Sequence, residues 1–337
     1  MKSVIVTGAT SFIGVHLVNL LLIKGYFVYA VVRPNSNNLL RLRSNPNLKI
    51  VPLDLSEIMQ LANYVDVSVD CFYHLAWEGV RAHNRDDFGR QQNNYKCAIK
   101  AIKIAAKIGC KAFVGAGSQA EYGAVKGIIT ENCNESPSSM YGKAKLQTFR
   151  EGFLTSKNVG MRFLWPRIFS VYGPFDFDST LIMSCISRMQ KNESIDLTKC
   201  SQLWDFLYVE DAVSALVKLG ESEKLEGVYN IASGIALPLR DYVITMKEIF
   251  SSQSILNFGE IEVSAERLIS IAPSIDKIKT DTDWHPWVSF EEGINKMVNL
   301  FDLLRKKYQD VEIQPIRQTF PTFSSKQVIC PLLISSD

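Results

Sequence analysis

The first half of the chain alternates short apolar runs with helical patterns, and this alternation restricts the fold more than any other feature. Apolar runs at residues 2–8, 26–33, 47–55, 70–77, 111–118 and 160–170 predict six strands. Helical patterns lie at 11–25, at 91–109 and around Tyr141. Because parallel strands need long crossover connections, usually helices, the pattern predicts an α/β fold with a doubly wound parallel sheet. Ligands of such sheets bind at the carboxyl ends of the strands.

The alternation loosens after about Pro174. Helical segments at 210–221 and 289–308 mix there with isolated strands such as 227–233. We therefore predict a dinucleotide-binding domain at 1–170 and a mainly substrate-binding part at 171–308, from which some segments return to the first domain. Residues 309–337 are predicted to form an irregular tail.

Composition excludes several classes of protein. The 337 residues carry a net charge of +2, which gives no signature of nucleic-acid binding. No apolar run approaches the ~20 residues that cross a bilayer, so no membrane partner is expected. Seven cysteines without a CxxC pair indicate reduced thiols and a cytoplasmic location. The four histidines lack metal-ligand spacing, so no metal site is predicted.

A glycine turn follows the first predicted strand. In "VTGATSFIG", Gly8 and Gly14 frame the turn into the first predicted helix, with Ser11 between them. Glycines at such a turn let the backbone approach a pyrophosphate, which then lies at the helix amino terminus. An ordinary glycine turn is the alternative. The position between an apolar strand and an apolar helix favours dinucleotide binding and a Rossmann-type fold.

The end of the second predicted strand indicates which dinucleotide is bound. NAD sites usually place an acidic residue there, but this chain has Val32 followed by Arg33. An arginine suits the 2′-phosphate of NADP, and Ser36 lies close behind it. A solvated surface arginine is the alternative. NADP(H) is therefore the preferred cofactor, and NAD(H) is the other possibility.

A tyrosine and a lysine share one helix face in "SSMYGKAKLQ". Tyr141 and Lys145 are four residues apart, and an ammonium beside a phenol lowers the pKa of that phenol. Ser118 ends the fifth predicted strand and offers a hydroxyl at the same ligand edge. These three residues form a candidate catalytic set that is able to polarise a carbonyl.

Taken together, these motifs resemble the extended short-chain dehydrogenase/reductase family of nucleotide-sugar epimerases, dehydratases and reductases. The resemblance runs from residue 1 to about residue 300. It is carried by "TGATSFIG", "HLAW", "GSQAEYG", "YGKAK", "RIFSVYGPFD", "WDFLYVEDA" and "YNIASG". Within the family, the chain looks most like reductases of nucleotide-linked 4-keto-6-deoxy sugars, such as the dTDP-fucose and CDP-abequose synthases.

The resemblance implies roles for matching positions. Ser118, Tyr141 and Lys145 match the catalytic triad. With the residues from the turn and the second strand, the predicted cofactor-binding set is Gly8, Thr10, Ser11, Phe12, Ile13, Gly14, Arg33, Ser36, Asp54, Leu55, Leu75, Ala76, Trp77, Asn94, Gly117, Tyr141, Lys145, Pro166, Ile168 and Phe169. The predicted substrate contacts are Gln119, Ser170, Trp204 and Arg267.

The departures from the family pattern reduce the number of reactions that the chain is expected to catalyse. Gln119 and Ala120 stand where the 4,6-dehydratases carry an acid pair, which disfavours dehydration. Trp204 replaces an arginine that is common in the family. The usual pyrophosphate-binding arginine is also missing, and Arg267 lies close to its position and is a candidate substitute. The predicted function is NADPH-dependent reduction of the C4 keto group of a dTDP- or CDP-linked 4-keto-6-deoxyhexose. A 4-epimerase with retained NAD is the alternative, and a non-catalytic NAD(P)-binding regulator is a third possibility.

The resemblance also implies a homodimer that pairs helix 91–109 with the Tyr141 helix. Small or apolar residues available for this pairing are Ala98, Ile102, Ala105, Ala106, Leu146, Phe149 and Phe153. The alternative is that these residues only pack on the sheet. The lysines at 96, 100, 103 and 107 are expected to form a solvated face.

Overall fold

A parallel sheet forms the centre of the larger part of the molecule. The computed structural model describes residues 2–81, 84–262 and 269–307. The sheet has the order β12-β8-β5-β4-β1-β2-β3, and its pairs are parallel. Its strands are β1 Ser3–Thr7, β2 Phe27–Val32, β3 Leu48–Pro52, β4 Cys71–His74, β5 Ala112–Gly115, β8 Arg162–Ile168 and β12 Gly227–Ile231. The doubly wound parallel sheet expected from the alternation is confirmed.

The strand order reverses between β1 and β4. The chain first builds outward on one side through β2 and β3, and then on the other side through β4, β5, β8 and β12. In doubly wound sheets, the crevice at this switch point binds ligands outside the carboxyl ends of the strands. The loops after β1 and β4 are therefore the place to look for a site.

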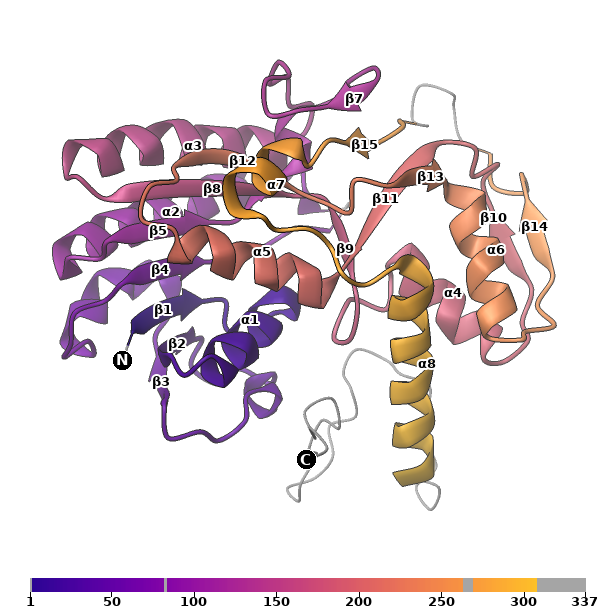
Figure 1. Cartoon of the computed structure of the whole chain (residues 1–337), viewed down its shortest axis with the longest axis horizontal. Helices are drawn as coiled ribbons and strands as arrows, with labels where there is room; N and C mark the ends of the chain where they lie inside the picture. The colour runs from indigo at the N-terminus through magenta and orange to yellow at the C-terminus, as the bar shows by residue number, and fades with distance from the viewer. Residues whose placement is uncertain (1, 82–83, 263–268, 308–337) are drawn as a thin grey trace.

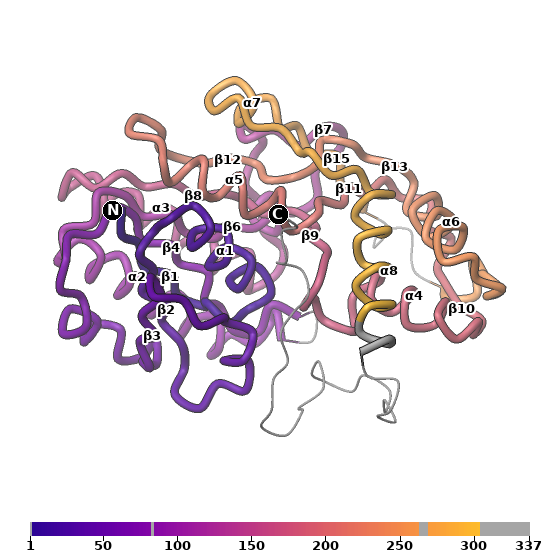
Figure 2. The backbone as a smooth tube through the Cα atoms, turned by 60° about the horizontal axis from the view of Figure 1, so that its bottom comes forward, coloured from indigo at the N-terminus to yellow at the C-terminus, as the bar shows by residue number. Residues whose placement is uncertain are grey.

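Helices cover both faces of the sheet. On one face, α1 Phe12–Ile23 and α5 Val209–Glu221 pack into the apolar core. On the other face lie η2 Leu55–Asn63, α2 Phe88–Ile108 and α3 Met140–Asn158. Figure 2 shows the same layers from another direction. The sheet is thus buried on both sides, which agrees with its almost continuous apolar strands.

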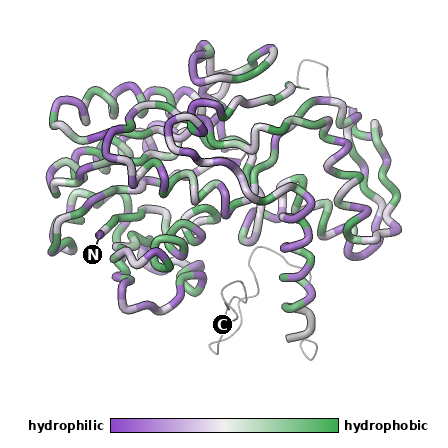
Figure 3. Tube along the Cα trace, viewed as in Figure 1, coloured by the Kyte–Doolittle hydropathy of each residue, from purple (hydrophilic) through white to green (hydrophobic). Residues whose placement is uncertain are grey.

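A smaller part with its own core lies beside the sheet (Figure 1). It comprises β9 Ser170–Tyr172, α4 Leu181–Met189, β10 Ile195–Leu197, β11 Leu203–Tyr208, β13 Ala236–Pro238, α6 Leu239–Ile249, β14 Leu256–Phe258 and α8 Phe290–Lys307. Polar and apolar residues alternate along α8 in Figure 3. Its apolar residues Ile294, Met297 and Phe301 recur at i, i+3 and i+7 and pack into this core.

Two segments of the C-terminal half are part of the larger part of the molecule: one packs on the central sheet and the other is a strand of it. The helix α5 and the strand β12 both follow residue 170, yet they pack on or pair with the central sheet. Short connecting pieces are β7 Ile128–Ile129, which pairs with β15 Ala272–Pro273, and α7 Asp276–Thr282. The division at residue 170 remains a prediction, and residues 308–337 lie outside the described part of the chain.

Helix α2 has one solvated face, and its small residues lie in the core. Lys96, Lys100, Lys103 and Lys107 are all exposed, as expected. Ala98, Ile102 and Ala105 are completely buried, because α3 and the sheet cover them within one chain. The expectation that these three residues face a second subunit is therefore wrong, and Leu146 is buried as well. Ala106, Phe149 and Phe153 are only partly buried, so for them the expectation stays a prediction. The helix is apolar over most of its circumference because it contacts both the sheet and its neighbour α3.

Candidate active site

The turn after β1 needs both of its framing glycines. Gly8 has φ +68°, and a Cβ there would lie 2.8 Å from the backbone nitrogen of Ala76, in the loop after β4. A Cβ on Gly14 would lie 2.0 Å from the carbonyl oxygen of Gly8. Ser11 caps α1, since its hydroxyl accepts a hydrogen bond from the Gly14 amide at 3.2 Å. This tight backbone, opening a helix at the switch point, fits a pyrophosphate.

The predicted NADP residues lie beside this turn. The Ser36 hydroxyl is 3.4 Å from the Thr10 hydroxyl. Arg33 is two-thirds exposed and pairs with Glu78 at 3.4 Å. Hydrogen bonds from Ser56 lower the pKa of Asp54, and Arg33 adds a smaller effect in the same direction. The ends of β1, β2 and β3 therefore bring these predicted residues together.

Arg41 belongs to the same region, although the sequence analysis missed it. Its guanidinium donates to the Thr10 carbonyl at 3.4 Å and lies 5.1 Å from the centre of the Phe175 ring. Burial lowers the pKa of this arginine. Arg41 ends the short 3-10 helix η1 Leu39–Arg41, which is too brief to give a periodic signal that indicates this contact.

The candidate catalytic residues converge and are all buried. Ser118 ends β6 Gly117–Ser118, where it pairs with Ile168 of β8. Tyr141 and Lys145 lie in the first two turns of α3, which Ser139 caps. The exposed fractions of Ser118, Tyr141 and Lys145 are 5%, 7% and 3%. Ser118 lies close enough to the Tyr141 phenol to lower the pKa of that phenol, and the Lys145 ammonium donates to the Ala116 carbonyl at 2.7 Å.

Burial dominates the acid–base properties of this pair. It raises the pKa of Tyr141, against the opposing effects of the Ser118 hydrogen bond and the charge of Arg85. Burial also lowers the pKa of Lys145 to about 7, and the charge of Glu121 opposes this shift. The expectation that Lys145 lowers the pKa of the phenol is therefore not met, because desolvation outweighs the nearby charges.

Trp77 contacts both members of the pair. The Lys145 ammonium lies 3.6 Å from the centre of the indole ring, and the Tyr141 ring meets the indole edge-on at 6.2 Å. The indole N–H donates to Gln91 at 2.8 Å. Asn94 holds the same loop through the backbone of Glu78 and is 5% exposed. The Asn94 amide thus supports this loop, and its predicted contact with the cofactor stays a prediction.

Arg85 is a second residue that the sequence analysis missed. Its guanidinium lies 5.0 Å from the centre of the Tyr141 ring and donates to the Val80 carbonyl at 2.9 Å. Its own carbonyl accepts from the Tyr141 amide at 2.8 Å. Arg85 lies in the loop before α2, and only the packing of that loop on α3 brings it to the phenol.

The remaining predicted residues lie at or near the carboxyl ends of the strands and the starts of the helices that follow them. Their positions follow from the strand and helix ends: Phe12 and Ile13 begin α1, Leu55 begins η2, Leu75 and Ala76 follow β4, Gly117 lies in β6, and Pro166, Ile168 and Phe169 lie at the end of β8. The predicted substrate residues Ser170 and Trp204 are also together, since the indole N–H donates to the serine hydroxyl at 2.9 Å. The side-chain oxygen of Gln119 is buried without a hydrogen-bond partner in the described part of the chain. Arg267 lies outside the described residues.

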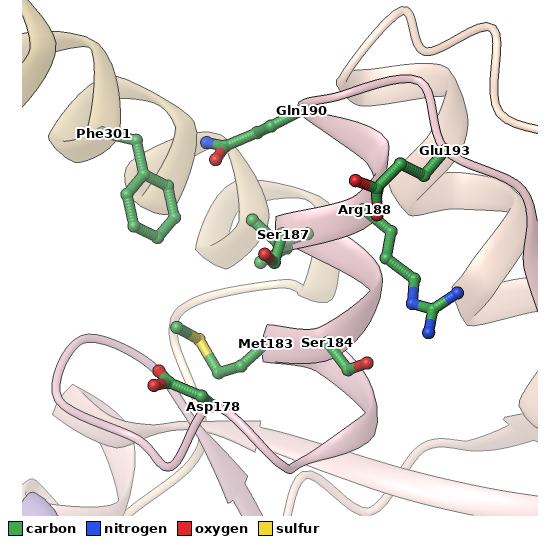
Figure 4. A pocket seen from close by; sticks show the side chains of 9 residues that line it. Asp178, Met183, Ser184, Ser187, Arg188, Gln190, Glu193 and Phe301 are labelled. Carbon is green, nitrogen blue, oxygen red and sulfur yellow. The ribbon is translucent and has the colours of Figure 1, made fainter. Parts of the chain in front are cut away.

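A separate cavity of about 200 Å³ lies between α4 and α8 (Figure 4). Its lining includes Asp178, Met183, Arg188, Glu193 and Phe301. None of the predicted site residues lines it. Among the residues that the structure describes, no three His, Cys, Asp or Glu side chains group as metal ligands. No helix in this part of the chain is long and apolar enough to span a membrane.

The sheet, its switch-point turn and the Ser–Tyr–Lys set define the class of protein, which is an NAD(P)-dependent enzyme of the oxidoreductase type. Residues 4–232 match the NAD dependent epimerase/dehydratase family, and the chain belongs to this family. This match confirms the prediction from the motifs that the chain is an extended short-chain dehydrogenase/reductase.

Proteins that catalyse different reactions resemble this chain to a similar degree in sequence and fold. The chain is 24% identical to CDP-abequose synthase of Salmonella muenchen over 89% of its own length and 98% of that protein. UDP-glucose 4-epimerase of Thermotoga maritima has the same fold, with a TM-score of 0.81, 24% identity and coverage of 90% and 99% of the two chains. For dTDP-glucose 4,6-dehydratase of Bacillus anthracis in complex with NAD, the TM-score is 0.78, the identity 19% and the coverage 92% and 99%.

Proposed function

We propose that this enzyme reduces the C4 keto group of a dTDP- or CDP-linked 4-keto-6-deoxyhexose with NADPH. The observation that carries the proposal is the convergence of Ser118, Tyr141 and Lys145 beside the switch-point crevice. The similarity to CDP-abequose synthase over nearly the whole of both chains supports this substrate class.

The residues of the site suit reduction of a carbonyl. NADPH supplies a hydride when it is bound. Tyr141 is a neutral phenol near pH 7, because burial raises its pKa, and it can donate a proton to the carbonyl oxygen. Ser118 offers a hydrogen bond to the same oxygen as negative charge develops there. Lys145 is placed to hold the ribose of the cofactor.

Dehydration of the sugar is disfavoured. The 4,6-dehydratases that the motifs resemble carry an acid pair after the serine or threonine of the triad, and this chain has Gln119 and Ala120 there. The buried side-chain oxygen of Gln119 is an acceptor for a substrate hydroxyl instead. This difference supports a ketoreductase over a dehydratase.

The preference for NADPH rests on Arg33. This side chain is two-thirds exposed, has a weakly held acidic partner in Glu78, and lies near Ser36 and Thr10. We expect Arg33→Ala to weaken NADPH binding by roughly 1.5–3 kcal/mol, the range for a lost charged hydrogen bond, and NADH binding far less. Fluorescence titration of both cofactors measures this. Equal losses for the two cofactors would contradict the prediction.

A 4-epimerase with retained NAD is the second candidate. The observation that favours it is the fold similarity to UDP-glucose 4-epimerase, at a TM-score of 0.81. The two functions differ in the state of the cofactor. An epimerase is purified with bound NAD and shows no net consumption of the cofactor, whereas a reductase consumes one NADPH per product.

The deciding experiment is a panel of dTDP-, CDP-, GDP- and UDP-linked 4-keto-6-deoxy sugars. Each sugar is incubated with NADPH and with NADH, and cofactor consumption and the product are measured. We expect consumption of NADPH with a dTDP- or CDP-linked sugar. Interconversion of nucleotide hexoses without net consumption would assign the epimerase, and no reaction in either assay would favour the non-catalytic regulator.

The assembly and location also belong to the proposal. We propose a homodimer, as expected from the family, which uses the outward face of α2 and α3. Leu154 on α3 and Phe88 at the start of α2 are each 62% exposed. We propose a cytoplasmic location because the six described cysteines are unpaired, which fits a reducing compartment. The seventh, Cys330, lies outside the described residues.

A further inference from the structure

A buried carboxylate lies directly behind the candidate catalytic residues. Glu121 ends the short helix η4 Gln119–Glu121 and is completely buried. Its carboxylate accepts from the Ser118 amide at 2.7 Å, from the Trp165 indole N–H at 3.0 and 3.1 Å, and from Arg167 Nε at 2.8 Å. All these partners are N–H donors. The ionised form is therefore the one that fits, although burial by itself raises the pKa of Glu121.

Burying the charged carboxylate of Glu121 costs desolvation energy, and the need to neutralise Arg167 does not by itself explain why the carboxylate is buried. Arg167 is also completely buried, but its Nη2 already pairs with Glu135, which in turn pairs with Arg150 at 3.0 Å. A buried ion pair is often no more stable than apolar side chains of the same shape. A role at the neighbouring site gives Glu121 a function beyond this pair.

The first contribution of Glu121 is geometric. Ser118 and Glu121 form a capping box: the Glu121 carboxylate accepts from the Ser118 amide, while the Ser118 hydroxyl accepts from the Ala120 amide at 3.2 Å. The Ser118 side chain also lowers the pKa of the neighbouring Tyr141 phenol. Glu121 therefore fixes the backbone that positions the Ser118 hydroxyl toward the phenol.

The second contribution is electrostatic. Glu121 is the carboxylate whose charge supports the protonated form of Lys145. His74 also faces this lysine, but burial lowers its pKa to about 3, so it is neutral at pH 7. The other neighbours of the ammonium are the Trp77 ring, the Tyr141 ring and the Ala116 carbonyl.

The groups around the carboxylate and the phenol complete the charged environment. Glu121 itself faces Arg167, Trp165 and Ser118. The charged groups that act on the Tyr141 phenol are Arg85 and Glu121. Glu121 is thus the only acid that acts on both Tyr141 and Lys145 among the described residues.

We propose that Glu121 is a positioning residue of this site, which holds the Ser118 backbone in place through the capping box and provides a buried negative charge behind the candidate catalytic residues. The inference rests on the proposed function, because that function gives Ser118, Tyr141 and Lys145 their roles. Glu121 is completely buried and its printed partners are protein N–H groups, so the proposed role acts through these residues.

The test compares Glu121→Gln with the matched control Glu135→Gln. A glutamine keeps the size of Glu121, and its amide oxygen can still accept from the Ser118 amide, so the variant removes the charge and preserves the shape. Glu135 also pairs with Arg167, but it has no bond to Ser118 and is not among the charges that act on Lys145.

The first readout is the pH profile of kcat with whichever keto sugar the panel identifies. In Glu121→Gln, we expect the alkaline limb to move to lower pH by about one unit, which lowers kcat on that limb about tenfold. KM should change less than about threefold, because Glu121 does not contact the substrate. An unshifted limb, or an equal shift in Glu135→Gln, overturns the proposal.

The second readout needs no substrate. The free energy of unfolding is measured between pH 5 and pH 10 with and without Lys145→Met, in the wild-type and Glu121→Gln backgrounds. The difference in unfolding free energy between the proteins with and without Lys145→Met begins to rise near the pKa of Lys145 in the folded state. This pH should be about one unit lower in the Glu121→Gln background. An unchanged pH overturns the role of Glu121, whereas a failed sugar panel with a shifted pH overturns only the proposed function.

A folding defect in Glu121→Gln would not block the test. The double variant Glu121→Gln/Arg167→Gln removes both charges of the buried pair, so no unpaired arginine is left in the core. We expect the same downward shift for Lys145 in this background. No shift in the double variant also overturns the proposal.

Discussion

The chemistry of single residues here depends on burial more than on their neighbours in sequence. Tyr141 and Lys145 are four residues apart on α3, which alone suggests a phenol activated by an ammonium. Inside the protein, burial raises the pKa of the phenol and lowers that of the amine to about 7. The phenol is consequently a proton donor at neutral pH, which is the form that carbonyl reduction requires.

Tyr141→Phe tests the proton donor. The ring can still pack against Trp77, but no proton is available, so kcat should fall by about 10²- to 10⁴-fold. NADPH binding should remain largely intact in the same variant, as measured by fluorescence titration. Turnover within a few-fold of the wild type would remove Tyr141 from the mechanism.

Lys145→Met tests the cost of burying an ammonium. The folded pKa of Lys145 is lowered from 10.5 to about 7, so the unfolded chain binds more protons between these values. The stability of the wild type relative to the variant should therefore be lowest below pH 7 and should rise up to about pH 10.5. Each pKa unit corresponds to about 1.4 kcal/mol, so the whole change is on the order of several kcal/mol.

Urea unfolding of both proteins at pH 6 and pH 9.5 measures this difference. Because every other titrating group is shared, most of their effects cancel in the comparison. A difference in unfolding free energy that does not vary with pH would show that Lys145 titrates normally in the folded protein.

At the scale of elements, backbone contacts between loops build the crevice. The turn after β1 touches the loop after β4 so closely that Gly8 has no space for a side chain. The capped start of α1 follows directly at Ser11. The switch point of the sheet is therefore a packed backbone junction, and its shape depends on two elements that are about 70 residues apart in the chain.

Gly8→Ala tests this junction against Gly25→Ala. Both glycines have positive φ, +68° and +79°, so each alanine carries a strain of roughly 1–2 kcal/mol. A Cβ on Gly25 meets nothing within 4 Å, whereas on Gly8 it meets backbone atoms of Ala76 at 2.8 and 2.9 Å. Urea unfolding should show a clearly larger loss of stability for Gly8→Ala, and NADPH binding should weaken only in that variant. Equal losses would contradict the close approach.

At the scale of the whole molecule, the proposed dimer requires a contact surface that the folded chain leaves exposed. Ala98, Ala101 and Ala105 of α2 lie inside one chain, so Ala105→Glu would disrupt the core and cannot report on a dimer. The exposed face of α2 carries four lysines, and the apolar side chains that are exposed on the helix pair are Phe88 and Leu154. A dimer on this face must therefore use these residues rather than the alanine stripe.

We expect sedimentation at micromolar concentration to show a dimer, and Leu154→Glu to shift it toward the monomer. A charge placed in an apolar contact would be buried without a partner. The control is Leu303→Glu, because Leu303 is 51% exposed on the distant helix α8. A monomeric wild type, or a dimer that Leu154→Glu leaves unchanged, would exclude this interface.

Local patterns in the sequence were enough to predict the sheet and the glycine turn, and they also gave the candidate catalytic set. Apolar period and turn residues act over a few positions, so strands such as 3–7 and helices such as 12–23 are visible in the chain itself. Gly8, Gly14 and the i, i+4 pair Tyr141 and Lys145 are local signals of the same kind.

Long-range packing decided the rest. Glu121 and Arg167 are 46 residues apart, and Arg85 reaches Tyr141 only because a loop folds over α3. The same packing buries Ala105 in the core and reverses the expected shift of the Tyr141 pKa. The sequence by itself determined which groups are present and which elements carry them. Only the tertiary structure decided how deeply each group is buried, because desolvation depends on everything that surrounds a side chain.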